Sequence, residues 1–169
     1  VLEADPNFKM AYHYRGIAKG KLKDYKGAIN DFSKVIELSP DIAEAYYNRA
    51  DPKYDLEDYQ GAIEDYNKAI DLNSNYKIAY SARGITKSMI NNYQGAIDDL
   101  SKAIEIDPDY KWAYQNRGKA KSNLKDYKGA IEDFDKVIEL DPDYKVANEE
   151  RDKARKLLNW KPKISLEEG

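Results

Sequence analysis

The residue types that carry most enzyme chemistry are scarce in this chain of 169 residues. It has no cysteine, which excludes disulfides, thiolate nucleophiles and thiolate metal sites. Its one histidine, His13, does not suffice for a histidine-based metal site or catalytic dyad, and we interpret it as a surface or partly packed residue. No phosphate-binding loop motif is present. We therefore expect a protein that is not an enzyme and that needs no cofactor and no metal.

The charge and the hydropathy of the chain argue against two kinds of partner, nucleic acid and membrane. Charged residues make up 35% of the chain, yet the net charge is only -3, so both signs are interspersed. A nucleic-acid partner would require a basic face, and no membrane span is expected because no apolar run approaches about 20 residues. The chain begins at Val1 and not at Met, so a targeting segment could be missing from what we interpret as a fragment. A soluble protein, cytoplasmic by default, is expected.

The charged residues that do follow a pattern are four arginines, each with an aspartate sixteen residues later. The pairs are Arg15 with Asp31, Arg49 with Asp65, Arg83 with Asp99, and Arg117 with Asp133. Solvated surface charge is one interpretation. We favour an ion pair between two helices, because the arginine fork fits a carboxylate. If exposed, such a pair would contribute no more than about 1 kcal/mol.

These pairs lie in a sequence that repeats every 34 residues. Residues 126–134, DYKGAIEDF, recur in close copies at 24–32, 58–66 and 92–100. A fixed period of this size predicts a stacked array of units that cover one another's apolar faces. Apolar residues at helical spacing and proline or other turn residues predict helices over 9–22 and 25–38. The same helix pair is expected at 43–72, 77–106 and 111–140, followed by a single helix at 145–158.

Small and bulky residues occupy fixed columns of the repeat. Gly16, Gly84 and Gly118, with Ala50 in the second copy, form a small column of the first helix. A second small column holds Ala28, Ala62, Ala96 and Ala130, a bulky one holds Phe32, Tyr66, Leu100 and Phe134, and Pro40, Pro108 and Pro142 end units. With these columns the chain resembles tetratricopeptide repeat (TPR) proteins over residues 9–158. The arginine column is a departure, since the family usually has an apolar residue there.

The resemblance implies an all-α fold: an α-solenoid of four helix–turn–helix units and a C-terminal capping helix, in a right-handed superhelix. Val1 to Phe8 is interpreted as the remnant of a preceding repeat of a longer array. The units are expected at 9–42, 43–76, 77–110 and 111–144, the capping helix at 145–158 and a polar tail at 159–169.

Two features of the columns have alternative interpretations. Tyrosines recur in every unit at Tyr12, Tyr46, Tyr80, Tyr114 and at Tyr25, Tyr59, Tyr93, Tyr127. They could form an aromatic ligand box, but repetition in every unit favours core packing. Pro52 falls in a predicted helix, so the helix from Ala43 is expected to end or kink near Asp51. This site could be a hinge or a point where chains exchange segments; we favour a tolerated kink.

In TPR proteins the first helix of each unit lines a concave groove that receives a peptide, so the resemblance implies a site. The expected groove residues are Met10, His13, Tyr14, Ile17, Tyr47, Asn48, Ile78, Ser81, Ile85, Trp112, Gln115, Asn116 and Lys119, with Glu44, Asp51 and Ala82 on the same helices. Trp112 is expected to act either as an apolar anchor or as a packing residue over Ile78 or Val146. His13 and Ile17, with Ile78 and Ala82, replace the basic and amide residues of the subfamily that holds chaperone C-termini, which argues against that ligand.

Two functions remain open at this point. One is a protein-interaction scaffold that binds a protein or peptide partner in the groove. The other is a structural module that self-associates by end-to-end stacking or segment exchange of repeats. An exposed N-terminal edge that includes Leu2 would favour a homo-oligomer.

Overall fold

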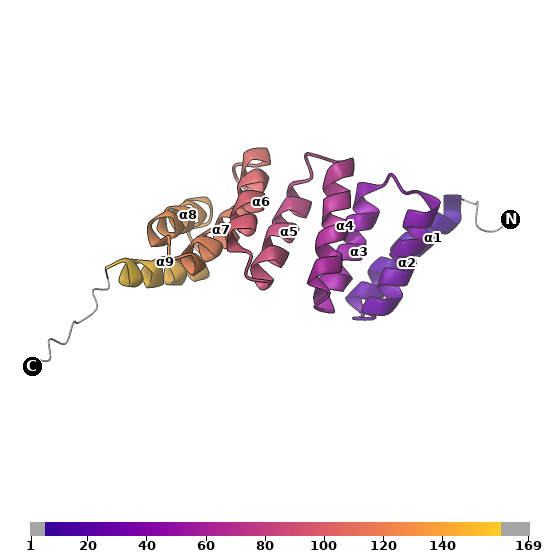
Figure 1. Ribbon diagram of the computed structural model, residues 1–169, viewed down its shortest axis with the longest axis horizontal. Coiled ribbons are helices and arrows are strands. Elements are labelled where there is room, and N and C mark those ends of the chain that lie inside the picture. Colours follow the sequence, from indigo (N-terminus) through magenta and orange to yellow (C-terminus); the bar gives the residue numbers. More distant parts are fainter. Residues whose placement is uncertain (1–5, 160–169) are drawn as a thin grey trace, which may run out of the picture. The chain divides into compact units, whose positions relative to one another are not determined.

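The computed structural model describes residues 6–159, and within them every regular element is an α-helix (Figure 1). The helices are α1 (Pro6–Lys21), α2 (Tyr25–Leu38), α3 (Ala43–Asp55), α4 (Tyr59–Leu72), α5 (Lys77–Met89), α6 (Tyr93–Ile106), α7 (Lys111–Asn123), α8 (Tyr127–Leu140) and α9 (Lys145–Leu158). The all-α fold and the four helix pairs are confirmed. The helix α1 begins at Pro6, earlier than the expected Lys9, so residues 6–8 form its first turn. Leu2, Trp160 and the tail beyond Asn159 lie outside the described residues.

The chain divides into two compact parts, residues 1–108 and residues 109–169. The first part contains α1 to α6, in which each helix packs against the next one along the chain. The second part contains α7, α8 and α9, packed in the same sequential manner. We call α1, α3, α5 and α7 the A helices, and α2, α4, α6 and α8 the B helices. No helix among the described residues is long and apolar enough to cross a membrane.

The B helices begin in the same way in every repeat. Asp24, Asp58, Asn92 and Asp126 are their N-caps, and each side chain accepts a hydrogen bond from the glycine N–H three residues later. This bond satisfies one of the donors that a helix start leaves without a partner. The residue before each cap has a positive φ of 61° to 63°, in the left-handed region that non-glycine residues rarely occupy; these residues are Lys23, Glu57, Asn91 and Lys125.

Close contact between the A and B helices of a repeat depends on the glycine column. A Cβ atom added at Gly118 would lie 2.7 Å from the Phe134 ring, and one at Gly84 would lie 2.9 Å from Leu100 Cγ. The four alanines of the B-helix column are completely buried. Both columns therefore act as the sequence predicts, by allowing two helices to approach closely.

Pro52 does not interrupt its helix, and that prediction is wrong. The helix α3 is continuous from Ala43 to Asp55. It is 13 residues long, as are α5 and α7. Pro52 is buried in the last turn of α3, where the Leu56 N–H donates to its carbonyl. A proline lacks one N–H, so α3 loses one backbone hydrogen bond, to the Asn48 carbonyl, and the helix nevertheless continues to Asp55.

The last helix of the described residues, α9, resembles an A helix. Ala147 and Ala154 are buried against the rest of the second part, while Val146, Leu157 and Leu158 are exposed. Asp152 stands where the A helices have glycine or alanine, and it is exposed. A further helix could not approach that position closely without burying the carboxylate, which is consistent with the expected capping role.

Candidate functional site

The four predicted arginine–aspartate pairs all form, and each joins the A and B helices of one repeat. Arg83 Nε and Nη2 donate to the two oxygens of Asp99 at 2.8 and 2.5 Å, and the other three pairs have the same two-bond geometry. The aspartates are buried rather than exposed. In the first pair, the hydrogen bond from Arg15 holds the pKa of the Asp31 carboxyl below its usual value.

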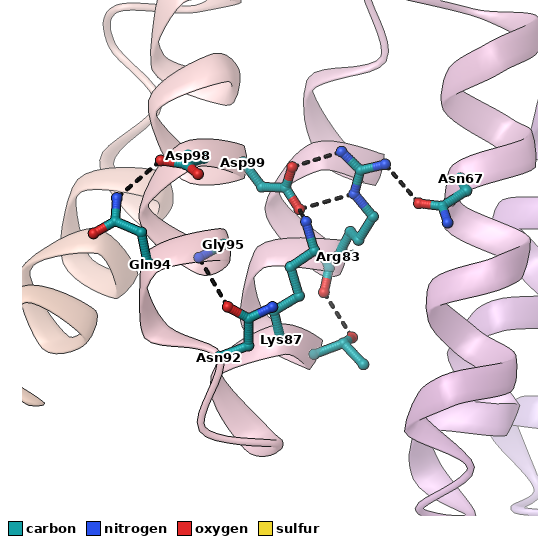
Figure 2. Close-up of polar contacts among 10 residues, drawn as sticks. Asn67, Arg83, Lys87, Asn92, Gln94, Gly95, Asp98 and Asp99 are labelled. Carbon is teal, nitrogen blue, oxygen red and sulfur yellow. Dashed lines mark hydrogen bonds and ion pairs between the residues drawn. The ribbon is translucent and has the colours of Figure 1, made fainter.

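A lysine one turn after each arginine binds the same aspartate, which the sequence analysis did not predict. Lys87 Nζ lies 2.8 Å from Asp99 Oδ2 (Figure 2). Lys19, Lys53 and Lys121 occupy the same position in the other repeats, at 2.9, 2.7 and 2.9 Å from their aspartates. Each buried carboxylate is thus held by two cations, an arrangement that we call the triad.

The remaining guanidinium nitrogen of the arginine, Nη1, binds a residue of the preceding repeat. Arg83 Nη1 donates to Asn67 Oδ1 on α4 at 2.6 Å, so that Arg83 lies between Asn67 and Asp99 (Figure 2). Arg49 Nη1 similarly donates to Ser33 on α2, and Arg151 of α9 donates to Asp135 on α8. The arginine column therefore ties neighbouring helix pairs together within each compact part.

The first tyrosine column supports these arginines. The guanidinium carbon of Arg83 lies 5.4 Å from the centre of the Tyr80 ring, and Tyr12, Tyr46 and Tyr114 lie under their arginines at 5.2 to 5.7 Å. A cation over an aromatic face at this distance is stabilising. The tyrosines are thus packing residues, in agreement with the favoured interpretation.

The expected groove residues of the first compact part differ widely in exposure. Met10 and Tyr14 on α1 are exposed, whereas His13, Ile17, Tyr47, Asn48, Ile78 and Ile85 are half-buried. Ser81 is only 3% exposed, so a ligand that rests on this surface would not reach it. His13 Nε2 lies 3.8 Å from Glu44 Oε1 on α3, and its ring contacts Phe32.

In the second part, Trp112 is the most exposed large apolar residue of α7, at 46%. Its ring meets Tyr144 edge-on at 5.6 Å, so it packs against this tyrosine. Asn116 is half-buried and donates to the Trp112 carbonyl at 2.8 Å, and Lys119 is exposed. Gln115 is only 2% exposed, and neither its Nε2 nor its Oε1 has a hydrogen-bond partner among the described residues.

Each compact part has a hollow beside its A helices. The hollow of the first part has a volume of about 290 Å³ and includes Ile17, Asn48 and Asp51 in its lining. That of the second part has a volume of about 450 Å³ between α7 and α9, where Lys119, Glu150 and Lys153 supply its charges. Two expected groove residues, Ile17 and Asn48, therefore meet at one hollow, while Lys119 lines the other.

Among the residues that line the first hollow, Asp51 is unusual because it is a half-buried carboxylate. The Tyr66 hydroxyl donates to its Oδ1 at 2.7 Å, and burial raises the pKa of the Asp51 carboxyl. Burial also raises the pKa of the Tyr66 hydroxyl, and that of nearby Tyr76 to about 12. The rings of Tyr66 and Tyr76 lie 5.8 and 5.4 Å from Tyr47. This link between a groove residue and the bulky column exists in one repeat only and has no periodic signal.

The side chains that the A helices leave accessible are of mixed chemistry. No group of His, Cys, Asp and Glu that could hold a metal ion occurs among the described residues. The half-buried and exposed side chains of the A helices instead present apolar surface, amides and separate charges, which are the usual means of holding a peptide.

Known proteins agree with this architecture. The tetratricopeptide repeat profiles match residues 11–42 and 112–144, and a TPR repeat profile matches residues 50–87 and 90–125. No curated protein sequence matches the chain.

Three solved structures are similar over most of their length. The crystal structure of MamA protein is 27% identical with a TM-score of 0.78, covering 91% of this chain and 90% of that one. The Arabidopsis OM64 TPR domain is 30% identical with a TM-score of 0.65, covering 68% and 94%. The second TPR domain of human RPAP3, in complex with the HSP70 peptide SGPTIEEVD, is 28% identical with a TM-score of 0.65, covering 67% and 94%. The 34-residue columns, the helix pairs and these matches together show that the chain belongs to the tetratricopeptide repeat family.

Proposed function

We propose that this chain is a non-catalytic interaction scaffold whose A helices bind a peptide segment of a partner protein. The observation that carries the proposal is the contrast between packing positions, which are alike in every repeat, and surface positions of the A helices, which differ. The triads and the small and bulky columns recur in every repeat, whereas one surface position reads Met10, Glu44, Ile78 and Trp112. All repeats share the same packing, so the residue type can vary only at positions that packing does not use. Such variation is useful for recognising a specific ligand.

Trp112 is the residue that we expect to contribute most to the binding energy of the peptide. Tryptophan is enriched among residues that dominate binding energy, and nearly half of this side chain remains exposed after its contact with Tyr144. The RPAP3 domain, which is similar in fold and 28% identical, is bound to a peptide, and this supports a peptide ligand here. The ligand itself is expected to differ, because Ile17, Ile78 and Ala82 replace basic and amide residues of the chaperone-binding subfamily.

The test begins with a random peptide library displayed on phage and selected on the purified chain. For the selected peptides, Trp112→Ala should weaken binding by about 30-fold or more, equivalent to about 2 kcal/mol. The matched control is Leu124→Ala, since Leu124 is equally exposed at 46% but lies beyond the end of α7. Failure to enrich any peptide, or equal binding by Trp112→Ala and wild type, would reject the proposal.

A second function is favoured by one observation, the open face of α1. Tyr14 is 63% exposed, and Ala11, Ala18 and Leu22 beside it are also exposed. In α3 the residues that correspond to Ala11 and Ala18 are Ala45 and Pro52, and both are buried. We propose that two copies of the chain associate through their α1 faces.

The oligomeric state tests this second proposal. Static light scattering against concentration should show a monomer–dimer equilibrium that Tyr14→Lys shifts to monomer. The exposed Leu72→Lys, on α4, is the control and should leave the equilibrium unchanged. A monomer at all concentrations would reject self-association and leave the peptide scaffold unaffected.

A further inference from the structure

The hollow of the first compact part has a polarity that predicts the chemistry of its ligand. Its apolar walls come from α1, α2 and α3, and include Ile17, Tyr25, Phe32 and Pro52. Asp51 also lines it, and Asp55 lies one helical turn further along α3. An apolar hollow with carboxylates at one side is complementary to a side chain with an apolar stem and a cationic head.

Asp51, which is half-buried, lacks the cations that the four buried aspartates of the chain's described part have. Asp65, in the same repeat, is bound by both Arg49 and Lys53. These two basic residues flank Asp51 in the sequence, two positions before and two after it. Residues two apart on a helix do not face each other, so both cations lie away from the hollow and Asp51 faces it without them.

The remaining charges do not neutralise Asp51. No lysine or arginine of the described residues lies within 4.0 Å of its carboxylate or of Asp55, although Lys21 lines the same hollow. Its hydrogen-bond partners are the neutral hydroxyls of Tyr66 and Tyr47. A partly buried carboxylate without a cation is unfavourable, and burial accordingly raises the pKa of Asp51.

The contact between Asp51 and the Tyr66 hydroxyl is not part of the framework that the repeats share. The other repeats have Ile17, Ile85 and Lys119 at the position of Asp51, and Phe32, Leu100 and Phe134 at that of Tyr66. Their triads and helix pairs form all the same. The carboxylate is therefore not required for packing, and its position in a hollow on the A-helix side favours a role in binding.

We propose that the Asp51 hollow is a subsite for a basic side chain, lysine or arginine, of the peptide partner. This inference rests on the proposed peptide-binding function and names the chemistry of one part of it. The cation would pair with Asp51 and Asp55 while its methylenes cover Ile17 and Pro52. Arginine would bind more tightly than lysine, because its planar head also stacks on the half-buried ring of Tyr25.

The experiment uses N-acetylated, C-amidated alanine pentapeptides with arginine, lysine, citrulline or norleucine at the centre. Each is titrated into the ¹⁵N-labelled chain and followed by amide chemical shifts. Arginine and lysine should give saturable shifts in α3 around Asp51, and neutral citrulline and norleucine should not. Asp51→Asn, which keeps an acceptor for Tyr66, should weaken the arginine peptide by at least about 10-fold.

Two further variants sharpen the test. Asp71→Asn removes the same charge from an exposed position of α4 and should leave the affinity unchanged. Lys21→Ala removes a like charge from the hollow and should strengthen binding of the arginine peptide. Equal binding of arginine and citrulline peptides, or an unchanged affinity of Asp51→Asn, would overturn the subsite.

Failure of the subsite is distinguishable from failure of the scaffold. If library peptides bind in a Trp112-dependent way and contain no basic residue that senses Asp51, the subsite is wrong and the proposed function stands. If no library peptide and none of the four pentapeptides binds, the proposed function itself fails.

Discussion

Removing one triad carboxylate is the most informative perturbation of the framework. Asp99 is 5% exposed and forms ion pairs with both Arg83 and Lys87, whose side chains are 15% and 21% exposed. Asp99→Ala leaves these two cations without their shared acceptor. Loss of one partner of a buried ion pair costs about 3–5 kcal/mol, and we expect the lower end because both cations retain some solvent contact.

The neighbouring residue is a matched control. Asp98 is exposed on the same helix, and its side chain accepts one hydrogen bond, from exposed Gln94 (Figure 2). Asp98→Ala should change the unfolding free energy by no more than about 0.5 kcal/mol. In thermal melts followed by circular dichroism, Asp99→Ala should lower the Tm by about 6–12 °C. Equal Tm values for the two variants would refute the idea that the buried carboxylate holds the helix pair together.

Four further outcomes are expected from melting and denaturant experiments. Gly118→Leu should lose about 1–3 kcal/mol because the new side chain meets the Phe134 ring, so a wild-type Tm would show that the column is not closely packed. Gln115→Met should gain about 1 kcal/mol by removing a buried amide that has no partner, and a loss would indicate an unseen partner. Glu57→Gly should gain up to about 1 kcal/mol by relieving a positive φ, whereas Glu64→Gly, in the exposed interior of α4, should lose a similar amount. The lowered pKa of Asp31 means that its contribution to stability is present above its unfolded pKa and is lost as pH falls through its folded pKa, so an Asp31→Asn variant should show a weaker fall in Tm below about pH 4.

The framework could be predicted from the sequence because it is periodic. The spacing of Arg83 and Asp99 recurs four times, and that recurrence separates an ion pair from scattered surface charge. Lys87 has the same recurrence, four residues after the arginine in every repeat, so the triad was accessible to the same reasoning and was missed.

Features that occur once were predicted less well. The expected interruption at Pro52 was wrong, because the proline removes only one backbone hydrogen bond and the tertiary packing of its buried ring cannot be read from the sequence. The left-handed residues do recur in every repeat, but three of the four are lysine or glutamate, types that do not favour a positive φ. The burial of Ser81 and Gln115 depends on neighbouring helices, which a family column does not specify.

The contacts of Asp51 show how a repeat framework can leave room for a specific site. In its repeat, the triad uses Arg49, Lys53 and Asp65, so the close approach of α3 and α4 does not depend on Asp51. Tyr66 still fills the space of the bulky column with its ring, and its hydroxyl meets Asp51 at the hollow. The energetic cost of the partly buried acid therefore falls on a helix pair that the triad already holds. This separation of tasks explains why an unfavourable carboxylate is tolerated on the A-helix side, where a ligand that brings a cation would relieve its cost.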